Sequence, residues 1–398
     1  RPGPVHLTVP QDVLEAEVPE QWMDPRAFSM LGVVRPNCPA PTDLVAQGAR
    51  LIEEAERPVL VAGSGVFYSG GAAALARLAA SARIPVIVPI WDRGSVESRM
   101  PEFAGVVGAY SGGPDLLKDA DLAILVGARV DYRLGYLDVP EVSAGLRVLR
   151  IDSDPVELHQ GFEPKVAIQG DPKSVLEQIT GQLSSGSGER HAGWLEEAKR
   201  RDGAFRRRWQ SDAYTSSTPT GWHVVQALRP LVDNGAVLVV DGGNIGQWMH
   251  MTLCDRYPSD WLTCGASGVV GYGLGGAMAS RLAYPERPVI LLTGDGSIGF
   301  NLADIETAVR HDLPFVIVLA DDRSWGVTAS SQARQYGPEN VVGCVLGPVR
   351  YDLAAEALGA RGMRVEDPRE IGAAVEEALA SGRVTLIQVP IAGGGPAD

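Results

Sequence analysis

The sequence predicts an α/β protein with two doubly wound domains, each a parallel sheet covered by helices on both faces. From residue 42 to residue 389, segments with helical periodicity alternate with short apolar runs rich in β-branched residues, which is typical of parallel sheets. The alternation occurs twice, and the stretch SSGSG at residues 184–188 separates the two blocks. A chain of 398 residues has room for two or three domains.

The composition excludes several classes of protein. The chain is 45% hydrophobic and 21% charged, as expected of a globular protein, and its net charge of −14 disfavours nucleic acid as a partner. No apolar run approaches the roughly 18 residues that a membrane span needs. The four cysteines lack C-x-x-C spacing, so we expect neither a disulfide framework nor a zinc site. A reducing, cytoplasmic location fits this cysteine usage best.

The first block begins with a segment unlike the rest. Val5, Leu7 and Val9 alternate between prolines, which predicts a strand whose partners lie elsewhere, and no signal peptide is evident. A helix with Leu44, Val45, Leu51 and Ile52 on one stripe comes next, and an amphipathic segment at 171–179 closes the block. We expect strands at 59–62, 86–88, 122–126 and 148–151.

The second block follows SSGSG, which should be a flexible connector because it has no apolar anchor. Ligands of open α/β sheets bind beyond the carboxyl ends of the strands, so the residues just after each strand are candidates for a site. We expect these strands at 236–240, 288–293, 315–320 and 384–389.

Four glycine-rich segments follow predicted strands, at 63–65, 241–244, 268–276 and 294–297. Glycine lets backbone N–H groups approach an anion closely, since no Cβ intervenes. Each segment alone is weak evidence, because such turns also serve close packing.

The segment from Leu291 to Gly326 carries a stronger signal. Asp295 ends one buried strand, and Asp321 and Asp322 end the next. A right-handed crossover places these strand ends side by side. Two close carboxylates repel unless a hard dication lies between them, and Mg²⁺ is completed by phosphate and carbonyl oxygens. The sequence therefore predicts a magnesium and diphosphate site.

This segment resembles the thiamine diphosphate signature, GDG followed later by NN, of the acetolactate synthase and pyruvate decarboxylase superfamily. The resemblance implies a thiamine diphosphate-binding fold in which the side chains of Asp295 and Asp322 and the carbonyl of Ser324 bind Mg²⁺. Gly296 and Ser297 would hold the diphosphate. The superfamily usually has Asn in place of Asp322, but a carboxylate oxygen is the harder ligand for Mg²⁺.

Two upstream segments extend the resemblance. DGGNIGQW at 241–248 is similar to the DVGQHQMW segment beside the phosphates, and GASGVVGYGLGGAMA at 265–279 is similar to the segment that wedges the coenzyme into a V shape. Val270 would be the wedge, where the superfamily has Met, Leu or Ile. The coenzyme residues implied are Gly243, Asn244, Ile245, Gly268, Val270, Gly294, Asp295, Gly296, Ser297, Asp322, Ser324, Trp325, Gly326 and Val327.

The first block resembles the Rossmann-like central domain of the acetolactate synthase-like branch, in which a subset of members bind FAD or ADP. By that likeness Gly63, Gly65, Arg129 and Asp152 would line a nucleotide pocket. The alternative is a structural spacer without a nucleotide, and the sequence leaves both open.

The catalytic residue is not expected in this sequence. In the superfamily a glutamate from a pyrimidine-binding domain, which precedes the central domain, contacts the coenzyme, and we find no such block here. Another domain or subunit should supply it, in a homo- or hetero-oligomer, either a dimer or a tetramer. The resulting scheme is a tail of that domain at 1–18, the central domain at 19–183, a linker at 184–190 and the pyrophosphate-binding domain at 191–398.

The resemblance implies a thiamine diphosphate- and Mg-dependent lyase or transferase that breaks or makes a C–C bond. Its small-molecule substrate would be a 2-oxo acid, a 2-hydroxy ketone or a 2-hydroxyacyl-CoA. Two alternatives remain open. One is an electron-transfer or regulatory module that binds NAD or FAD, although GSGVFYSGG at 63–71 lacks the G-x-G-x-x-G spacing. The other is an inactive scaffold subunit.

Overall fold

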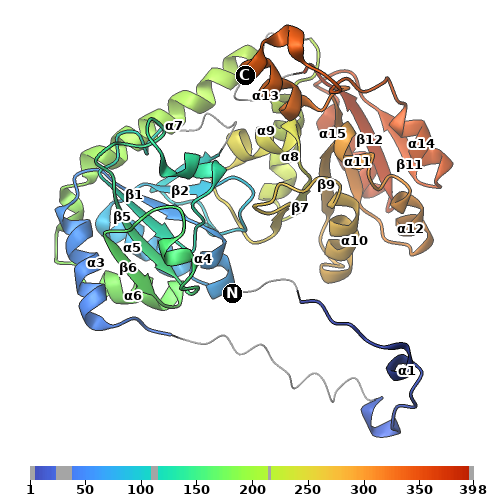
Figure 1. The fold of residues 1–398 in the computed structure, drawn as a ribbon. Coiled ribbons are helices and arrows are strands. Elements are labelled where there is room, and N and C mark those ends of the chain that lie inside the picture. The colour runs from blue at the N-terminus through green and yellow to red at the C-terminus, as the bar shows by residue number, and fades with distance from the viewer. Residues whose placement is uncertain (1–4, 24–37, 109–114, 214–216, 394–398) are drawn as a thin grey trace.

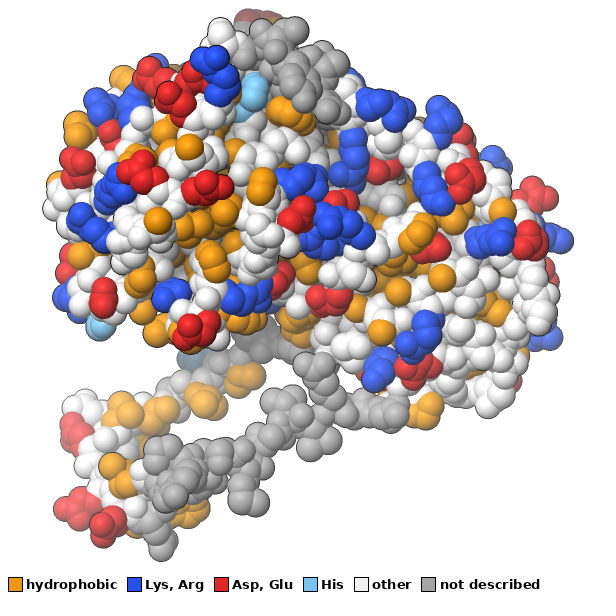
Figure 2. Space-filling model, turned by 180° about the vertical axis from the view of Figure 1, so that it is seen from behind, with side chains coloured by type: hydrophobic (Ala, Val, Ile, Leu, Met, Phe, Trp, Pro, Cys, Tyr) orange, Lys and Arg blue, Asp and Glu red, His pale blue; other side chains and the backbone are white. Residues whose placement is uncertain are grey.

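The structure, a computed structural model, describes residues 5–23, 38–108, 115–213 and 217–393. Two α/β units, each built around one sheet, lie side by side, and the long helix α7 (Ala192–Ala213) extends from the first toward the second (Figure 1). Acidic and basic side chains are interspersed over the face shown in Figure 2. Within the described ranges, no helix is both long and apolar enough to cross a bilayer.

The first unit has a six-stranded parallel sheet in the order β3-β2-β1-β4-β5-β6. Every residue of β1, β2 and β4 is buried, which explains their uninterrupted apolar runs. The strands are β1 (Pro58–Ala62), β2 (Val86–Pro89), β3 (Phe103–Val107), β4 (Leu122–Val126), β5 (Arg147–Asp152) and β6 (Val166–Gln169), and the helices are α3 (Thr42–Glu54), α4 (Ser64–Ser69), α5 (Ala72–Ala82) and α6 (Pro172–Gln182).

The second unit has a parallel sheet in the order β11-β12-β10-β9-β7-β8. The strands are β7 (Val237–Val240), β8 (Trp261–Thr263), β9 (Val289–Gly294), β10 (Val316–Asp321), β11 (Arg361–Arg364) and β12 (Thr385–Pro390). The helices are α8 (Gly221–Asp233), α9 (Asn244–Trp248), α10 (Gly273–Ala283), α11 (Asp295–Ile298), α12 (Asp304–Arg310), α13 (Gly326–Tyr336), α14 (Tyr351–Ala357) and α15 (Ile371–Ala380), with a π-helical turn at Met249–Leu253.

The predicted fold class is confirmed, and all eight predicted strands form within one residue of their expected ends. Four further strands were not predicted: β3, β6, β8 and β11. Each lies at an edge of its sheet. An edge strand is covered less completely than a central one, so its sequence lacks a continuous apolar run.

The strand expected at Val5, Leu7 and Val9, with partners elsewhere, is not formed among the described residues. No strand is assigned in residues 5–10, and Val5 and Leu7 are 84% and 79% exposed. Figure 1 shows this segment and the short helix α1 (Gln11–Leu14) apart from both sheets. A strand needs a neighbour for its N–H and C=O groups, and the described residues provide none beside this segment.

The connector expected at residues 184–188 forms a turn with hydrogen bonds to the first unit, and its flexibility stays a prediction. The backbone N–H and the hydroxyl of Ser184 both donate to Glu53 Oε1, at 2.7 and 2.6 Å. Gly188 is buried against Ser81 and Ala82, where a Cβ would lie 2.8 Å from the Ser81 carbonyl oxygen. Gly188 therefore serves close packing, whereas Ser184, Ser185 and Gly186 are exposed.

One apolar cluster continues from the first unit into the second. It includes Trp91 and Val96 of the first unit and Met249 and Tyr257 of the second. Val96 and Tyr257 also form an isolated antiparallel bridge. The two units therefore share part of their core, which fixes residues of both around the site described next.

Candidate functional site

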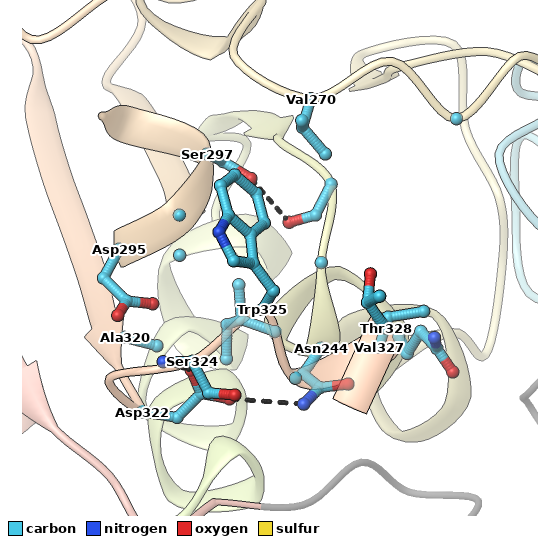
Figure 3. A pocket seen from close by; sticks show the side chains of 18 of the residues that line it. Asn244, Val270, Asp295, Ser297, Ala320, Asp322, Ser324, Trp325, Val327 and Thr328 are labelled. Carbon is cyan, nitrogen blue, oxygen red and sulfur yellow. Dashed lines mark hydrogen bonds between the residues drawn. The ribbon is translucent and has the colours of Figure 1, made fainter. Parts of the chain in front are cut away.

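A cavity of about 380 Å³ lies at the carboxyl ends of β7, β9 and β10 (Figure 3). Every residue that the sequence analysis assigned to the coenzyme lines this one cavity. These residues come from four glycine-rich or acidic strand ends that are far apart in the sequence. The parallel sheet brings them together because all its strands end at the same edge.

Asp295 and Asp322 follow two neighbouring strands, since Gly294 at the end of β9 pairs with Ala320 of β10. The side chain of Asp295 is buried, and its Oδ2 has no hydrogen-bond partner in the described part of the chain. Burial, with a contribution from the charges of Asp322 and Asp321, raises the pKa of Asp295 to about 7. An unpartnered buried carboxylate oxygen is costly, so this geometry favours a bound cation.

Burial also raises the pKa of Asp322, although hydrogen bonds to its carboxylate oppose the shift. Asn244 Nδ2 donates to Asp322 Oδ2 at 3.2 Å, and the Ser324 N–H donates to Asp322 Oδ1 at 3.1 Å. Figure 3 shows the Asn244 contact and places Asp295 and Asp322 on the same side of the cavity. The two carboxylates thus face a common space from adjacent strand ends.

The third acid at this edge of the sheet, Asp321, has hydrogen-bond donors of its own. Its carboxylate accepts hydrogen bonds from Gln388 Nε2 at 2.7 Å and from the Arg323 N–H at 3.2 Å. Among the described residues, no group of three His, Cys, Asp or Glu side chains is placed to hold a metal ion. A cation between Asp295 and Asp322 would therefore need further oxygens from the backbone or from a ligand, which suits Mg²⁺.

Two glycines leave space that a side chain would fill. A Cβ on Gly326 would lie 1.9 Å from Asn244 Nδ2 and 2.7 Å from Asp322 Oδ2. A Cβ on Gly296 would lie 2.8 Å from the ring of Trp325. Both positions face the cavity, so glycine here keeps the wall open to a ligand that approaches the backbone. The residues fit a diphosphate with a divalent cation.

Asp241 links the loop after β7 to the loop before α10, a role that the sequence analysis missed. Its buried carboxylate accepts from the N–H groups of Gly242, Gly271 and Gly273 at 2.8, 2.9 and 3.3 Å. These bonds join the loop after β7 to the loop before α10. Burial raises the pKa of Asp241, although the N–H groups counter part of this shift. An aspartate directly before paired glycines at a strand end was the available signal.

Val270 lies over the first of these loops. A Cβ on Gly242 would be 2.5 Å from Val270 Cγ1, which shows how closely the two segments approach. Ser297 Oγ donates to the Gly242 carbonyl oxygen at 3.3 Å (Figure 3). Val270 projects into the cavity, as a wedge residue must, but its role remains a prediction.

The first unit also contributes to the cavity wall, through Ile90, Trp91 and Tyr132. The Tyr132 hydroxyl donates to the Ala266 carbonyl oxygen at 3.2 Å, between the two units. None of these residues was predicted, because only the contact between the units brings them to the site. Sequence periodicity carries no such information.

The residues predicted for a nucleotide lie away from this cavity. Gly63 and Gly65 follow β1, Arg129 follows β4 and Asp152 ends β5. They share the carboxyl edge of the first sheet, as expected.

Two segments match known protein families. Residues 45–179 match "Thiamine pyrophosphate enzyme, central domain", and residues 241–389 match "Thiamine pyrophosphate enzyme, C-terminal TPP binding domain". The two matches fall on the first and second sheets respectively.

Individual relatives agree with these matches. The chain is 32% identical to the acetolactate synthase large subunit IlvG of Mycobacterium tuberculosis, over 89% of this chain and 63% of the relative. It is 26% identical to a probable acetolactate synthase large subunit of Methanococcus aeolicus, over 95% and 65%. It is 29% identical to 2-hydroxyacyl-CoA lyase 2 of Mus musculus, over 91% and 61%. The chain therefore spans less than two thirds of the length of these relatives.

Proposed function

The chain belongs to the thiamine pyrophosphate enzyme family, and on that premise we propose that it is the coenzyme-binding part of a Mg-dependent C–C bond lyase or carboligase. The observation that carries this proposal is the pair of adjacent buried aspartates, one with an unpartnered oxygen, at the rim of a cavity lined by glycines. An isolated pair of buried carboxylates is unfavourable without a cation.

In this proposal Asp295, Asp322 and the carbonyl of Ser324 bind Mg²⁺. The backbone at Gly296, with Ser297 and Asn244, holds the diphosphate, and Gly326 leaves room for it. When bound, thiamine diphosphate supplies the electron sink for breaking or making a bond next to a carbonyl. Val270 and Trp325 orient the organic part of the coenzyme by contact, and the apolar residues of the wall exclude water.

The base that the chemistry needs would come from another domain, because the described residues add no further acid to the cavity lining. The acids that line the cavity, as far as the structure describes it, are Asp295 and Asp322, and both are assigned to the metal. A glutamate on a pyrimidine-binding domain would supply the base, either on another segment of the same polypeptide or on another subunit. A dimer or tetramer with shared sites is the expected assembly.

The names of the relatives indicate the substrate class. Two are acetolactate synthase subunits, one of them termed probable, and one is a 2-hydroxyacyl-CoA lyase. We therefore assign a 2-oxo acid, a 2-hydroxy ketone or a 2-hydroxyacyl-CoA as substrate.

Calorimetric titration tests the coenzyme site. Binding of thiamine diphosphate should require Mg²⁺, and Asp295→Ala should abolish it, because the variant removes a carboxylate that faces the cation. Glu306→Ala is a matched control, since it removes an exposed carboxylate of the same unit. Coenzyme binding that survives Asp295→Ala, or that needs no metal, would refute the assignment.

The mass of the native assembly tests the origin of the base. A further domain of about 150 residues, on the same chain or on a partner, is expected from usual domain sizes. Turnover by an assembly of this chain alone would contradict the shared site.

A further inference from the structure

A loop of the first unit, residues 90–93, forms part of the wall of the cavity in the second unit. Trp91 in this loop has φ = +68°, a left-handed conformation that a bulky side chain rarely adopts. Its ring packs edge-on against His250, with centroids 4.7 Å apart. The ring also touches α9, because a Cβ on Gly246 would lie 2.6 Å from Trp91 Cη2. Such a conformation persists only where the surroundings hold it.

The neighbouring residue, Asp92, supplies the strongest of these restraints. Asp92 and Arg133 are 4% and 3% exposed, and Arg133 Nη1 donates to Asp92 Oδ1 at 2.8 Å. The same nitrogen donates to the Ile90 carbonyl oxygen at 3.1 Å. From the second unit, Thr263 Oγ1 donates to the Trp91 carbonyl oxygen at 2.8 Å. The loop is thus fixed on both sides of Trp91.

The other contacts of Asp92 are with the glycine-rich turn after β1. Ser64 donates to the Asp92 carboxylate through its N–H at 3.2 Å and its hydroxyl at 2.9 Å. In a dinucleotide-binding domain, the N–H groups of this turn face the diphosphate. Here a carboxylate of the protein itself takes the place of the phosphate.

The N–H groups of the two glycines in this turn also donate hydrogen bonds within the protein. The Gly63 N–H donates to the Val126 carbonyl oxygen and the Gly65 N–H to the Gly127 carbonyl oxygen, each at 3.0 Å. A Cβ on Gly63 would lie 2.3 Å from the Gly127 carbonyl oxygen, and one on Gly65 would lie 2.5 Å from Gly127 Cα. These glycines allow two turns of the protein to pack together, and their N–H groups are not presented to a ligand.

The remaining residues predicted for a nucleotide also have contacts of their own. Arg129 Nε lies 3.7 Å from Glu157 Oε1. Asp152 Oδ1 accepts from the Asp154 N–H at 2.9 Å. With the N–H groups of Gly63, Ser64 and Gly65 all engaged within the protein, the turn lacks the donors that the diphosphate of FAD or ADP would need.

We propose that Asp92 occupies the position of a nucleotide phosphate and, paired with Arg133, holds Trp91 as a wall of the coenzyme cavity. Asp92 and Arg133 are positioning residues, and the first unit serves the coenzyme directly, without FAD or ADP. The inference rests on the proposed function in one respect, namely that thiamine diphosphate is the ligand of the cavity.

The test measures coenzyme affinity in the full-length protein, by quenching of tryptophan fluorescence as thiamine diphosphate is added with Mg²⁺. Asp92→Asn removes one of the two carboxylates that pair with Arg133, since Asp131 remains at 2.7 Å, and it weakens the restraint on the loop, so the affinity should fall about tenfold. Glu157→Gln is the matched control. Glu157 is a buried acid paired with the buried Arg150 at 3.5 Å, outside the cavity, and its loss should leave the affinity unchanged.

A milder variant keeps the test decisive if Asp92→Asn does not fold. Ser64→Ala removes the hydroxyl's hydrogen bond to Asp92 and the one it accepts from the Arg93 N–H, but no charge, and we expect a fewfold loss of coenzyme affinity. Equal coenzyme binding by the wild type and by the folded Asp92 or Ser64 variant would overturn the inference. Failure of the wild type to bind the coenzyme would instead refute the proposed function.

The nucleotide is tested separately. ADP and FAD, each titrated up to millimolar concentration into the full-length protein loaded with coenzyme, should show no saturable binding. Stoichiometric binding of either nucleotide would overturn the inference, because the turn that Asp92 occupies would have to open.

Discussion

At the scale of single residues, the arrangement of charge around Asp295 is central to the proposed metal site. Its pKa is raised by burial first and by the neighbouring carboxylates second. A cation between Asp295 and Asp322 would reverse this effect, because an opposite charge favours the ionised form. The departure from the superfamily at Asp322 therefore adds attraction for the metal.

The variant Asp322→Asn restores the residue usual in the superfamily, and it should weaken Mg²⁺ binding without abolishing it. The amide oxygen remains a ligand but lacks the charge. We expect a loss of Mg²⁺ affinity of about tenfold, an order-of-magnitude figure for one charge at a partly screened site, measured at saturating thiamine diphosphate. Complete loss, as predicted for Asp295→Ala, would show that the amide oxygen does not serve as a ligand.

His250 provides a prediction about stability. It is fully buried beside Trp91 and Tyr257, and neither ring nitrogen has a partner among the described residues. Burial lowers its pKa from 6.5 to about 3. Below pH 6.5 the unfolded chain therefore binds a proton that the folded protein does not. Its contribution to stability is present above pH 6.5 and is lost as the pH falls toward 3.

The variant His250→Phe should remove this dependence and keep an aromatic ring beside Trp91. The free energy of unfolding, from urea titrations at several values between pH 7.5 and 4.5, should fall more steeply for the wild type, by up to about 1.4 kcal/mol per pH unit. Parallel profiles for the two proteins would contradict a buried neutral histidine.

At the scale of elements, the most deeply buried strands are the ones that the sequence predicts best. The central strands β1, β4, β9 and β10 are continuous apolar runs. An edge strand such as β11, with the sequence RGMR, has none. The segment at Val5, Leu7 and Val9 has the alternation of a strand but lacks a neighbour in the described structure. A pattern of side chains predicts a strand only where a sheet is present to receive it.

The residues of the site likewise divide into those that the sequence predicts and those that only the tertiary structure reveals. Asp295, Asp322 and the glycines around them belong to strand ends, so their convergence followed from the order of the strands. Trp91 and Tyr132 reach the cavity from the first unit, and Asp241 acts through hydrogen bonds to N–H groups up to 32 residues away. Such contacts depend on tertiary structure and leave no periodic signal in the sequence.

The glycine that begins α13 is tested by a matched pair of variants. Gly326→Ala should lower the affinity for thiamine diphosphate at least tenfold, because its Cβ would collide with Asn244 and Asp322. Gly275→Ala places the same methyl group on α10 in open space. It should raise stability by up to about 1 kcal/mol, through helix propensity, and leave affinity unchanged. Equal affinities for the two variants would contradict the proposed position of the diphosphate.

At the scale of the whole molecule, the two units share a core and an exposed ion-pair network. Arg99 of the first unit contacts Asp233 and Asp255 of the second, each at 2.7 Å. The Arg99 side chain is 54% exposed, so these ion pairs contribute little to stability. The apolar contacts of Trp91 and Val96 with the second unit dominate the interface.

The contrast between weak exposed ion pairs and buried apolar contacts predicts how the two units unfold. The wild type should show one calorimetric transition, and Arg99→Ala should shift it only slightly. Trp91→Ala, which removes a large buried ring from the shared cluster, should lower the melting temperature and separate the transition into two. Two transitions in the wild type would contradict a shared core.

The most direct measurement is a crystal structure of the full-length protein grown with thiamine diphosphate and Mn²⁺, with the metal located by its anomalous scattering. We expect one metal ion bound by Asp295, Asp322 and the Ser324 carbonyl oxygen, with the diphosphate against Gly296 and Ser297. A metal and diphosphate bound elsewhere, with Asp295 and Asp322 left without a cation, would contradict this assignment.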